Sequence, residues 1–231
     1  MISVIIPTFN EEAIIRGSLE DIHRPQVCGE IPFQVIVCDA RSTDRTVEEV
    51  ADFQGRTGNP VTLVESPLGR GLQMNRGAEE AIYLVLLFLH ADVSLPEGAF
   101  EAIRMSLQDP SVVGGGFLKS YREKSWKLAI NVLLTRIRAV CFKSFWGNDC
   151  IFVRRSAFRE LGGYQCWPIL EDVDFSKRMR KLGKTVAIRK HALASARRYL
   201  RRGILLQGMR NLKILFAYWL GKDPSNLKKW Y

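Results

Sequence analysis

Short apolar runs alternate with amphipathic stretches through the first half of the chain. The runs over residues 3–6, 34–38, 61–65 and 84–89 are rich in β-branched residues and apolar at successive positions. Strands have this pattern when helices cover both faces of a parallel sheet. We therefore expect four buried strands, each bordered by helices.

A helix start follows each of the first three runs. Asn10 can cap a helix that has Glu11 and Glu12 in its first turn, where carboxylates complement the positive end of the helix dipole. Asp44 and Gly71 precede the next two helical stretches. This alternation predicts an α/β fold with an open, mostly parallel sheet. Ligands of such sheets bind beyond the carboxyl ends of the strands.

The pattern changes after residue 110. Residues 112–119 predict another strand, residues 125–147 a long apolar and basic helix, and residues 170–183 a charged helix that ends at Gly183. The chain from Arg197 onward is basic and amphipathic. We expect one α/β domain over residues 1–200 and a helical tail over residues 201–231 that packs on the same domain.

Composition is that of a packed globular protein. Of the 231 residues, 47% are hydrophobic and 25% are charged, which excludes a disordered tail or a collagen-like fibre. Five cysteines without a C-x-x-C pair disfavour a disulfide framework and a structural zinc site, so we expect a reducing cytoplasm. The first apolar run lacks a preceding basic segment, and no run approaches the ~20 residues that cross a bilayer. We therefore expect neither a signal peptide nor a membrane span.

Charge is distributed unevenly along the chain. The formal net charge is +10, yet residues 176–231 contain sixteen Lys and Arg and a single acid, Asp223. A basic segment on an acidic body indicates an anionic partner such as a phosphate-bearing ligand or a lipid surface, with a solvated basic face as the alternative. We expect no nucleic-acid binding, because the chain has no recognition motif for it.

Polar residues stand where the predicted strands end. Asp39 and Asp44 follow the second strand, and His90 and Asp92 follow the fourth. One carboxylate at such a position can accept hydrogen bonds from a base or ribose, and another can hold a divalent cation. Arg70 stands between two glycines, so the backbone can approach a diphosphate while the guanidinium binds its oxygens. Together these residues predict a nucleotide-diphosphate site.

Four ordered motifs carry a resemblance to a known family: SVIIPTFNEE, VIVCDARSTDRT, FLHAD and LEDVDFSKRMRK. Over roughly residues 1–200 the chain resembles the family 2 glycosyltransferases of the GT-A fold. GRGLQMNRGA, GNDCIFVRR and SARRYLRRG resemble a bacterial subgroup of short members described as arsenosugar-biosynthesis type. The resemblance implies a Rossmann-like, mostly parallel sheet flanked by helices. It also implies inverting, metal-dependent transfer of a sugar from a nucleotide-diphosphate sugar to an unidentified acceptor hydroxyl.

The resemblance also implies roles for individual residues. Asp172 matches the general base of inverting members, and Glu171 stands beside it. Asp92 matches the last acid of the metal motif, whereas His90 replaces its first acid. An imidazole favours Mn²⁺ over Mg²⁺ at such a site, and the alternatives for His90 are a hydrogen bond to ribose or packing. The nucleotide pocket would be formed by Pro7, Thr8, Glu11, Asp39, Asp44, Arg70, Gly71 and Asn75.

Other residues leave two interpretations open. Arg41 can contact the base or a phosphate, or it can be solvated. Arg197 and Arg198 can cover the diphosphate as a lid or belong to a basic surface. Asp172 and Asp174 could also serve only to complement the dipole at the start of their helix.

The C-terminal helices and the reaction itself have alternatives too. Residues 126–146 and 203–221 mix apolar, aromatic and basic side chains, as do helices that lie on anionic membranes. They could instead pack on the sheet or on a second subunit of a homodimer. We expect a cytoplasmic protein, with the inner face of the membrane as a further candidate location. The main functional alternative is a catalytically silent GT-A module that binds nucleotide.

Overall fold

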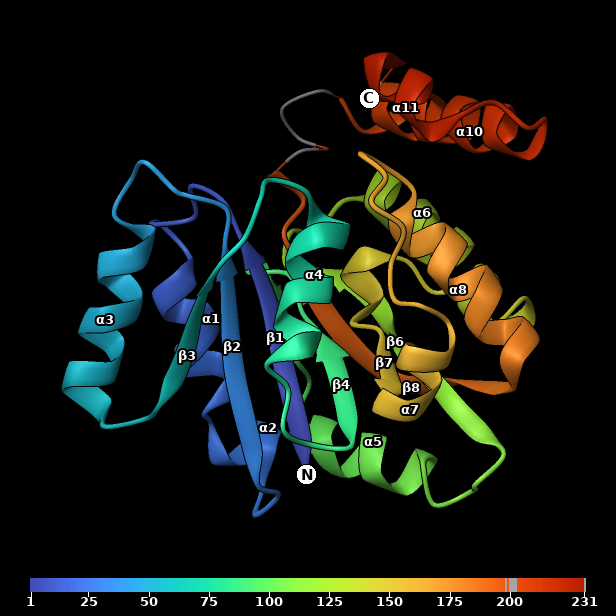
Figure 1. The fold of residues 1–231 in the computed structure, drawn as a ribbon. Coiled ribbons are helices and arrows are strands. Elements are labelled where there is room, and N and C mark those ends of the chain that lie inside the picture. Colours follow the sequence, from blue (N-terminus) through green and yellow to red (C-terminus); the bar gives the residue numbers. More distant parts are fainter. Residues whose placement is uncertain (198, 200–202, 231) are drawn as a thin grey trace.

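An eight-stranded sheet forms the centre of the structure (Figure 1), a computed structural model that describes residues 1–197, 199 and 203–230. The strand order is β3-β2-β1-β4-β7-β6-β8-β5. The first four of these are parallel, β7 is antiparallel to both neighbours, β6 and β8 are parallel, and β5 is antiparallel to β8. The predicted α/β fold with a mostly parallel sheet is therefore confirmed. The strands are β1 (Ile2–Thr8), β2 (Phe33–Asp39), β3 (Val61–Glu65), β4 (Val85–Phe88), β5 (Val93–Ser94), β6 (Val112–Tyr121), β7 (Phe152–Arg154) and β8 (Lys184–Ala194).

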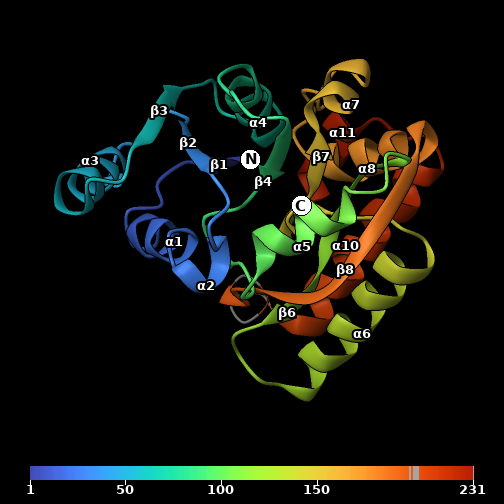
Figure 2. The ribbon, with the colours of Figure 1, turned by 90° about the horizontal axis from the view of Figure 1, so that it is seen from below.

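Helices cover both faces of this sheet (Figure 2). Successive side chains of a strand point to opposite faces, so β1 divides its residues between two cores. Val4 packs in a cluster with Leu19, whereas Ile5 packs in a cluster with Met74. The helices are α1 (Ile15–Ile22), α2 (Pro25–Cys28), α3 (Thr46–Thr57), α4 (Arg70–Glu79), α5 (Ala99–Ser106), α6 (Trp126–Cys141), η1 (Gly147–Asp149), α7 (Arg155–Glu160), α8 (Glu171–Leu182), α10 (Ile204–Trp219), α11 (Pro224–Leu227) and η2 (Lys228–Trp230).

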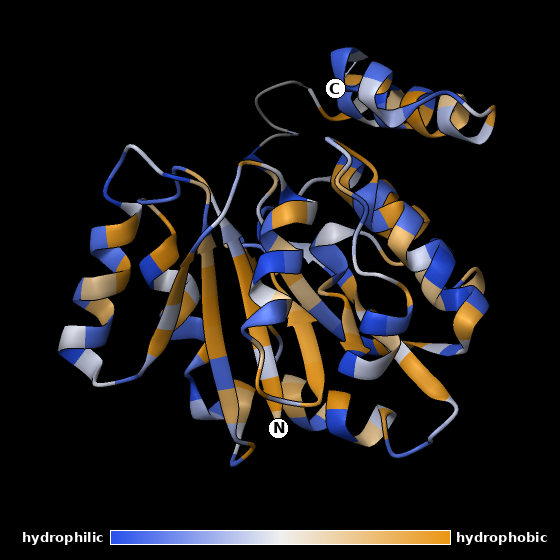
Figure 3. Cartoon of the chain, viewed as in Figure 1, coloured by the Kyte–Doolittle hydropathy of each residue, from blue (hydrophilic) through white to orange (hydrophobic). Residues whose placement is uncertain are grey.

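Burial follows position in the sheet. Every residue of β1 is buried, and the strongly hydrophobic β2 and β4 beside it are visible in Figure 3. The expectation that residues 61–65 are buried on both faces is wrong, because β3 is an edge strand and Leu63 is 42% exposed. An edge strand has only one neighbour, so its side chains keep contact with water.

Two helix starts differ from the sequence prediction. Asn10 does not cap α1, which begins at Ile15; its side chain instead accepts a hydrogen bond from the Thr43 backbone N–H (2.9 Å). Helix α4 begins at Arg70, so Gly71 lies inside the helix rather than before it. At Asn10 a contact between two loops replaces the predicted cap, and sequence pattern alone does not contain that contact.

The topology places a switch point at the neighbouring strands β1 and β4. From β1 the chain proceeds outward to β2 and β3, then returns to β4 on the other side of β1. Sheets of this kind bind ligands at such a switch point, outside the carboxyl ends of the strands. The residues that follow β1 and β4 are therefore the ones to examine.

The C-terminal helices lie beyond this same end of the sheet (Figure 1). Ile214 and Ala217 of α10 pack with Leu227 of α11 and with Ile169, which stands just before α8. Helix α10 also contacts α6, and the two run side by side in Figure 2. Among the described helices, none combines the length and the apolarity that crossing a membrane requires.

Candidate active site

Two joined cavities lie at the carboxyl ends of the central strands. The large cavity has a volume of about 650 Å³ and the small cavity about 180 Å³. Arg70, Asn148 and Tyr199 line both, so the two spaces are neighbours. Seven of the fifteen predicted site residues line the large cavity: Pro7, Thr8, Glu11, Arg70, His90, Asp92 and Arg197.

Asp39 holds the loops beneath the large cavity. It is 4% exposed, and its Oδ1 accepts hydrogen bonds from the Thr8 hydroxyl (3.0 Å) and the Ser42 hydroxyl (2.6 Å). Its Oδ2 accepts one from the Ser42 backbone N–H (2.7 Å). The carboxylate therefore ties the end of β1 to the loop after β2, and it sets the position of Thr8 on the cavity wall.

Asp44 and Arg41 also make contacts within this region. The Asp44 carboxylate accepts hydrogen bonds from the backbone N–H groups of Glu12 (3.1 Å) and Thr46 (3.0 Å). Desolvation favours the protonated acid, but the hydrogen bond from the Thr46 hydroxyl and those from the amides outweigh it and lower the pKa of Asp44. Arg41 pairs with Glu65 at 2.5 Å on the exposed edge of the sheet. Neither Asp44 nor Arg41 lines the two cavities.

Arg70 and Glu171 form a pair between α4 and α8. The Arg70 Nε lies 2.8 Å from the Glu171 Oε1, and Glu171 is only 1% exposed. Burial raises the pKa of Glu171 to about 7; the Arg70 charge opposes this rise and the neighbouring Asp172 adds to it. The Glu171 Oε2 is buried and has no hydrogen-bond partner among the described residues. Glu171 thus holds the Arg70 side chain, whereas Arg70 itself faces both cavities.

Asp172 lies at the start of α8 and lines the small cavity. Its Oδ1 accepts a hydrogen bond from the Val173 N–H (2.7 Å), and its Oδ2 accepts one from the Gly147 N–H (2.5 Å). The preceding Leu170 has φ +67°, a left-handed conformation that is costly for a leucine and that clusters at functional sites. The structure therefore separates the two predicted acids, because only Asp172 reaches a cavity.

His90 lies close to Asp172. A Cβ atom added to Gly147 would lie 2.6 Å from the His90 Nε2 and 3.2 Å from the Asp172 Oδ2. Glycine is therefore the residue that leaves room for the imidazole and the carboxylate at this point. Sequence reasoning did not identify Gly147, because its neighbours are distant in the chain.

His90 and Asp92 line the same wall of the large cavity. Within the described residues, no group of three or more His, Cys, Asp or Glu side chains could hold a metal ion. An imidazole and a carboxylate suit Mn²⁺, and hard divalent cations commonly keep several ligands from water or substrate phosphates. This donor pair therefore fits a cation that a phosphate-bearing ligand completes. His191 is exposed on β8 and lines neither cavity.

Gly71 and Asn75 contact the loop that leads toward α8. The Asn75 amide donates to the Tyr164 carbonyl (2.8 Å) and accepts from the Tyr164 N–H (2.8 Å). A Cβ added to Gly71 would lie 2.5 Å from the Gln165 carbonyl oxygen, so only glycine permits this approach. Sequence resemblance predicted both residues at the nucleotide; here neither lines the two cavities.

The basic pair after β8 is described only in part. Arg197 lines the large cavity, and its Nη2 lies 3.8 Å from the Glu11 Oε2. This contact joins the C-terminal segment to the loop after β1. Arg198, the other predicted diphosphate ligand, lies outside the described residues.

Sequence reasoning missed several residues of the cavity walls. Gln73 is 3% exposed, and its amide donates to the carbonyls of Thr8 (2.7 Å) and Cys38 (2.8 Å), which joins α4 to β1 and β2. Its spacing of three residues from Arg70 on one helix is a signal that could have identified it. Lys119, Gln207 and Asn211 line the small cavity without any local signal, whereas Asn148 and Tyr199, which also line it, lie in the motifs GNDCIFVRR and SARRYLRRG.

Comparisons with known proteins identify relatives of this chain. The profile of the family "Glycosyl transferase family 2" matches residues 3–202. A PGL/p-HBAD biosynthesis glycosyltransferase of Mycobacterium bovis is 32% identical over 185 residues, which are 77% of this chain and 69% of that relative.

Solved structures of other proteins show the same fold. One is the mannosyltransferase PcManGT from Pyrobaculum calidifontis in complex with GDP-Man and Mn²⁺, with a TM-score of 0.72 and 22% identity over 96% of this chain. The present chain spans 64% of PcManGT, less than two thirds of its length. Another is S. aureus TarS in complex with UDP-GlcNAc, with a TM-score of 0.60 and 18% identity over 85% of this chain and 58% of TarS. The sequence matches and the shared GT-A fold together establish that the chain belongs to glycosyl transferase family 2 and is a glycosyltransferase.

Proposed function

We propose that the protein transfers a sugar from a nucleotide-diphosphate sugar to an acceptor hydroxyl, with inversion at the anomeric carbon. The observation that carries this proposal is the pair of joined cavities, which has Arg70 on the shared wall and Asp172 on the small side. Family membership supports the reaction class. The ligands of PcManGT (GDP-Man) and TarS (UDP-GlcNAc) support a nucleotide-sugar donor.

The nucleotide and its diphosphate occupy the large cavity in this proposal. Pro7 and Thr8 at the end of β1 and Glu11 in the loop after it contact the nucleotide. Asp39 and Asp44 act on it by fixing the loops that carry these residues, because their oxygens already accept hydrogen bonds from the protein. Gly71 and Asn75 do not contact the nucleotide themselves. They position the loop that leads to α8, which they contact at Gln165 and Tyr164.

Asp92 and His90 would hold a divalent cation, Mn²⁺ or Mg²⁺, which would neutralise charge on the diphosphate. Arg70, which lines the same cavity, binds the leaving diphosphate, and Glu171 holds the guanidinium in place. Arg197, in the segment after β8, also lines this cavity and covers the diphosphate. Removing one preorganised electrostatic donor of this kind typically lowers turnover on the order of 10²- to 10³-fold.

Asp172 is the general base. Its carboxylate takes the proton of the acceptor hydroxyl while the hydroxyl oxygen attacks the anomeric carbon. The new carbon–oxygen bond forms as the bond to the diphosphate breaks on the opposite face, so the configuration inverts. Glu171 is less suited to this task, because it is buried beside Arg70 and lines neither cavity.

Substitution of the base tests this assignment. Asp172→Asn should lower turnover on the order of 10²- to 10⁴-fold and leave donor binding intact, because only the proton acceptor is lost. The matched control is Asp174→Asn, since Asp174 lies on the same helix and pairs with Arg178 at 2.6 Å. Product release from a panel of nucleotide sugars and acceptors, together with calorimetric donor binding, provides the measurements. Equal turnover of Asp172→Asn and wild type would reject the role.

The same experiment addresses the silent-module alternative. A chain that binds a nucleoside diphosphate without cation dependence, and releases no sugar from any donor in the panel, would be a binding module. The arsenosugar-type subgroup and a cytoplasmic location stay predictions from the sequence.

We further propose that the enzyme works at an anionic lipid surface. Helices α6 and α10 lie side by side and carry large apolar side chains that are 43–73% exposed, here called the α6–α10 face. Neither helix contains an acidic residue, and Lys127, Arg136, Arg210 and Lys213 are interspersed. Charge complementarity therefore favours an anionic membrane. The α6–α10 face consists of Trp126, Ile130, Leu133, Leu134, Ile137, Leu206, Met209, Leu212, Phe216 and Trp219.

Vesicle sedimentation tests this surface. The protein should bind phosphatidylglycerol vesicles more tightly than phosphatidylcholine vesicles, and Leu212→Glu with Trp219→Glu should abolish the binding. Leu63→Glu, an exposed leucine on the edge strand, is the control. Light scattering at matched concentrations detects the competing occupant: a homodimer that the same pair of substitutions dissociates, with no vesicle binding, would overturn the lipid proposal.

A further inference from the structure

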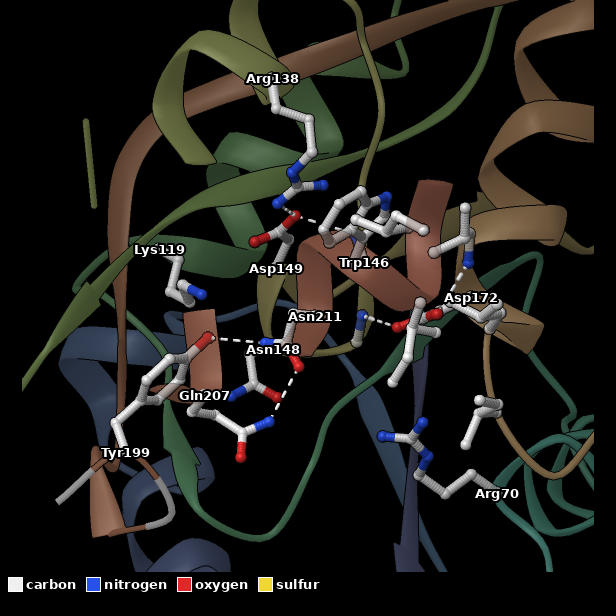
Figure 4. Close-up of a pocket in the computed structure, with 16 residues that line it drawn as sticks. Arg70, Lys119, Arg138, Trp146, Asn148, Asp149, Asp172, Tyr199, Gln207 and Asn211 are labelled. Atoms are coloured by element: carbon white, nitrogen blue, oxygen red, sulfur yellow. Dashed lines mark hydrogen bonds and ion pairs between the residues drawn. The ribbon is translucent and has the colours of Figure 1, made fainter. Parts of the chain in front are cut away.

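The small cavity is assembled from segments that lie far apart in the chain. Lys119 comes from β6, Asp149 from η1, Asp172 from α8, and Gln207 and Asn211 from α10 (Figure 4). Asp172 lines the small cavity, and Arg70 lines both the small and the large cavity. The small cavity is therefore on the acceptor side of the proposed reaction. Its volume of about 180 Å³ suits a small polar group rather than a whole nucleotide.

The cations of this cavity differ in how they are compensated. Arg138 pairs with Asp149 at 2.6 Å and stacks 3.9 Å from the centroid of the Trp146 ring. Arg70 pairs with Glu171 at 2.8 Å. Both guanidinium groups therefore have a carboxylate of their own.

No carboxylate among the described residues pairs with Lys119 in this way. Its ammonium lies 5.0 Å from the Tyr121 ring, and among the described residues no hydrogen bond or ion pair to it is present. Asp149 favours its charge at a distance, but the Asp149 Oδ2 already accepts from Arg138 and from the Trp146 N–H (2.8 Å). Burial lowers the pKa of Lys119 to about 8. A desolvated cation in a cavity is stabilised when an anion enters.

Gln207 supplies a second unsatisfied group. It is 1% exposed, its Nε2 donates to the Asn211 Oδ1 (2.8 Å), and Asn211 donates in turn to the Tyr199 hydroxyl (3.2 Å). The Gln207 Oε1 is buried and has no partner among the described residues. Buried carbonyl oxygens normally have a donor, so a hydroxyl or amide of a ligand completes this chain of hydrogen bonds.

We propose that the small cavity binds an anionic group of the acceptor, a phosphate or a carboxylate, through Lys119, while Gln207 accepts a hydrogen bond from a neighbouring hydroxyl of the same molecule. The inference rests on the proposed function for the position of the attacked hydroxyl, which lies at Asp172. Lys119 is then a specificity-determining residue: it selects acceptors that carry a negative charge close to the reacting hydroxyl.

Inorganic phosphate is the probe for this site. It is titrated into the protein in the presence of saturating nucleoside diphosphate and Mn²⁺, so that the large cavity is already occupied. Lys119→Met should weaken phosphate binding on the order of tenfold to a hundredfold, since a charge-assisted hydrogen bond is lost. Lys119→Arg should restore part of it. Lys124→Met, an exposed lysine just beyond β6, should change nothing.

The outcomes separate this inference from the proposed function. Equal phosphate affinity in Lys119→Met and wild type overturns the anion site, while donor binding and donor hydrolysis still test the glycosyltransferase assignment on their own. Failure of donor binding in the wild type rejects the proposed function instead. Thermal unfolding of each variant verifies that Lys119→Met is folded; if it is not, Lys119→Gln replaces it, and unchanged phosphate binding there overturns the site.

The source of the anion is distinguished by two acceptor arms. Glycerol 3-phosphate represents a water-soluble acceptor, with glycerol as its uncharged control. Phosphatidic acid in phosphatidylcholine vesicles represents a lipid headgroup. Competition with phosphate by either one, lost in Lys119→Met, supports the shared chemistry and identifies the source; competition by neither overturns the proposal.

Discussion

The large cavity is bordered by loops whose polar groups bind one another, whereas the small cavity has polar groups that the described residues leave without partners. On the large side, Asp39 accepts three hydrogen bonds and Gln73 donates two. On the small side, the Lys119 ammonium and the Gln207 Oε1 lack such bonds among the described residues. The difference agrees with the proposal that the large cavity is a preorganised donor side and that a ligand completes the small cavity.

Arg70 offers the largest effect, because it belongs to both cavities. Arg70→Met should lower turnover on the order of 10²- to 10³-fold through loss of charge at the leaving diphosphate. It also removes the cation that opposes protonation of Glu171, so the pKa of Glu171 should rise further above about 7. Steady-state rates give the first effect, and infrared titration of the carboxyl band gives the second. Arg76→Met, on the exposed face of the same helix, is the control.

Asp39 tests whether the large side is preorganised. Asp39→Ala should lower the free energy of unfolding by about 2–4 kcal/mol, because buried donors at Thr8 and Ser42 lose their acceptor. Lys119→Met on the small side should change the same quantity by less than about 1 kcal/mol, since it removes a half-buried charge that has no ion-pair partner among the described residues. Urea unfolding measures both. Similar losses in the two variants would contradict the contrast between the cavities.

The smallest effect concerns pH. The Lys119 ammonium loses its proton above its pKa of about 8, so sulfate affinity should fall about tenfold from pH 7 to pH 9. The charged groups around it are Asp149 from η1, Arg138 from α6, and Arg70 and Asp172 across the cavity. Sulfate keeps its charge over this range. The profile should flatten in Lys119→Arg, whose guanidinium stays protonated; the same slope in both proteins would mean that another group titrates.

The strand ends were predictable because their signals are local. The apolar runs located β1, β2, β3 and β4, and polar residues just after them pointed to Thr8, His90 and Asp92, which do line one cavity. The motif around Asp172 identified the acid that reaches the small cavity. Glu171 and Asn75 belong to the same motifs, yet their side chains contact Arg70 and Tyr164 instead of the cavities. A motif states which residues occur together, and packing decides what each one contacts.

What the sequence determined by itself is the sheet, its family and the acids at the carboxyl ends of its strands, because hydrophobic period and short motifs are properties of neighbouring residues. Only the tertiary structure decided which residues form the small cavity. Lys119 lies on β6 and Gln207 on α10, separated by most of the C-terminal half of the chain, and neither has a pattern around it that indicates a site. They meet because α10 packs beside α6 and over the loop before α8, and contacts of that range form only when the whole chain is folded.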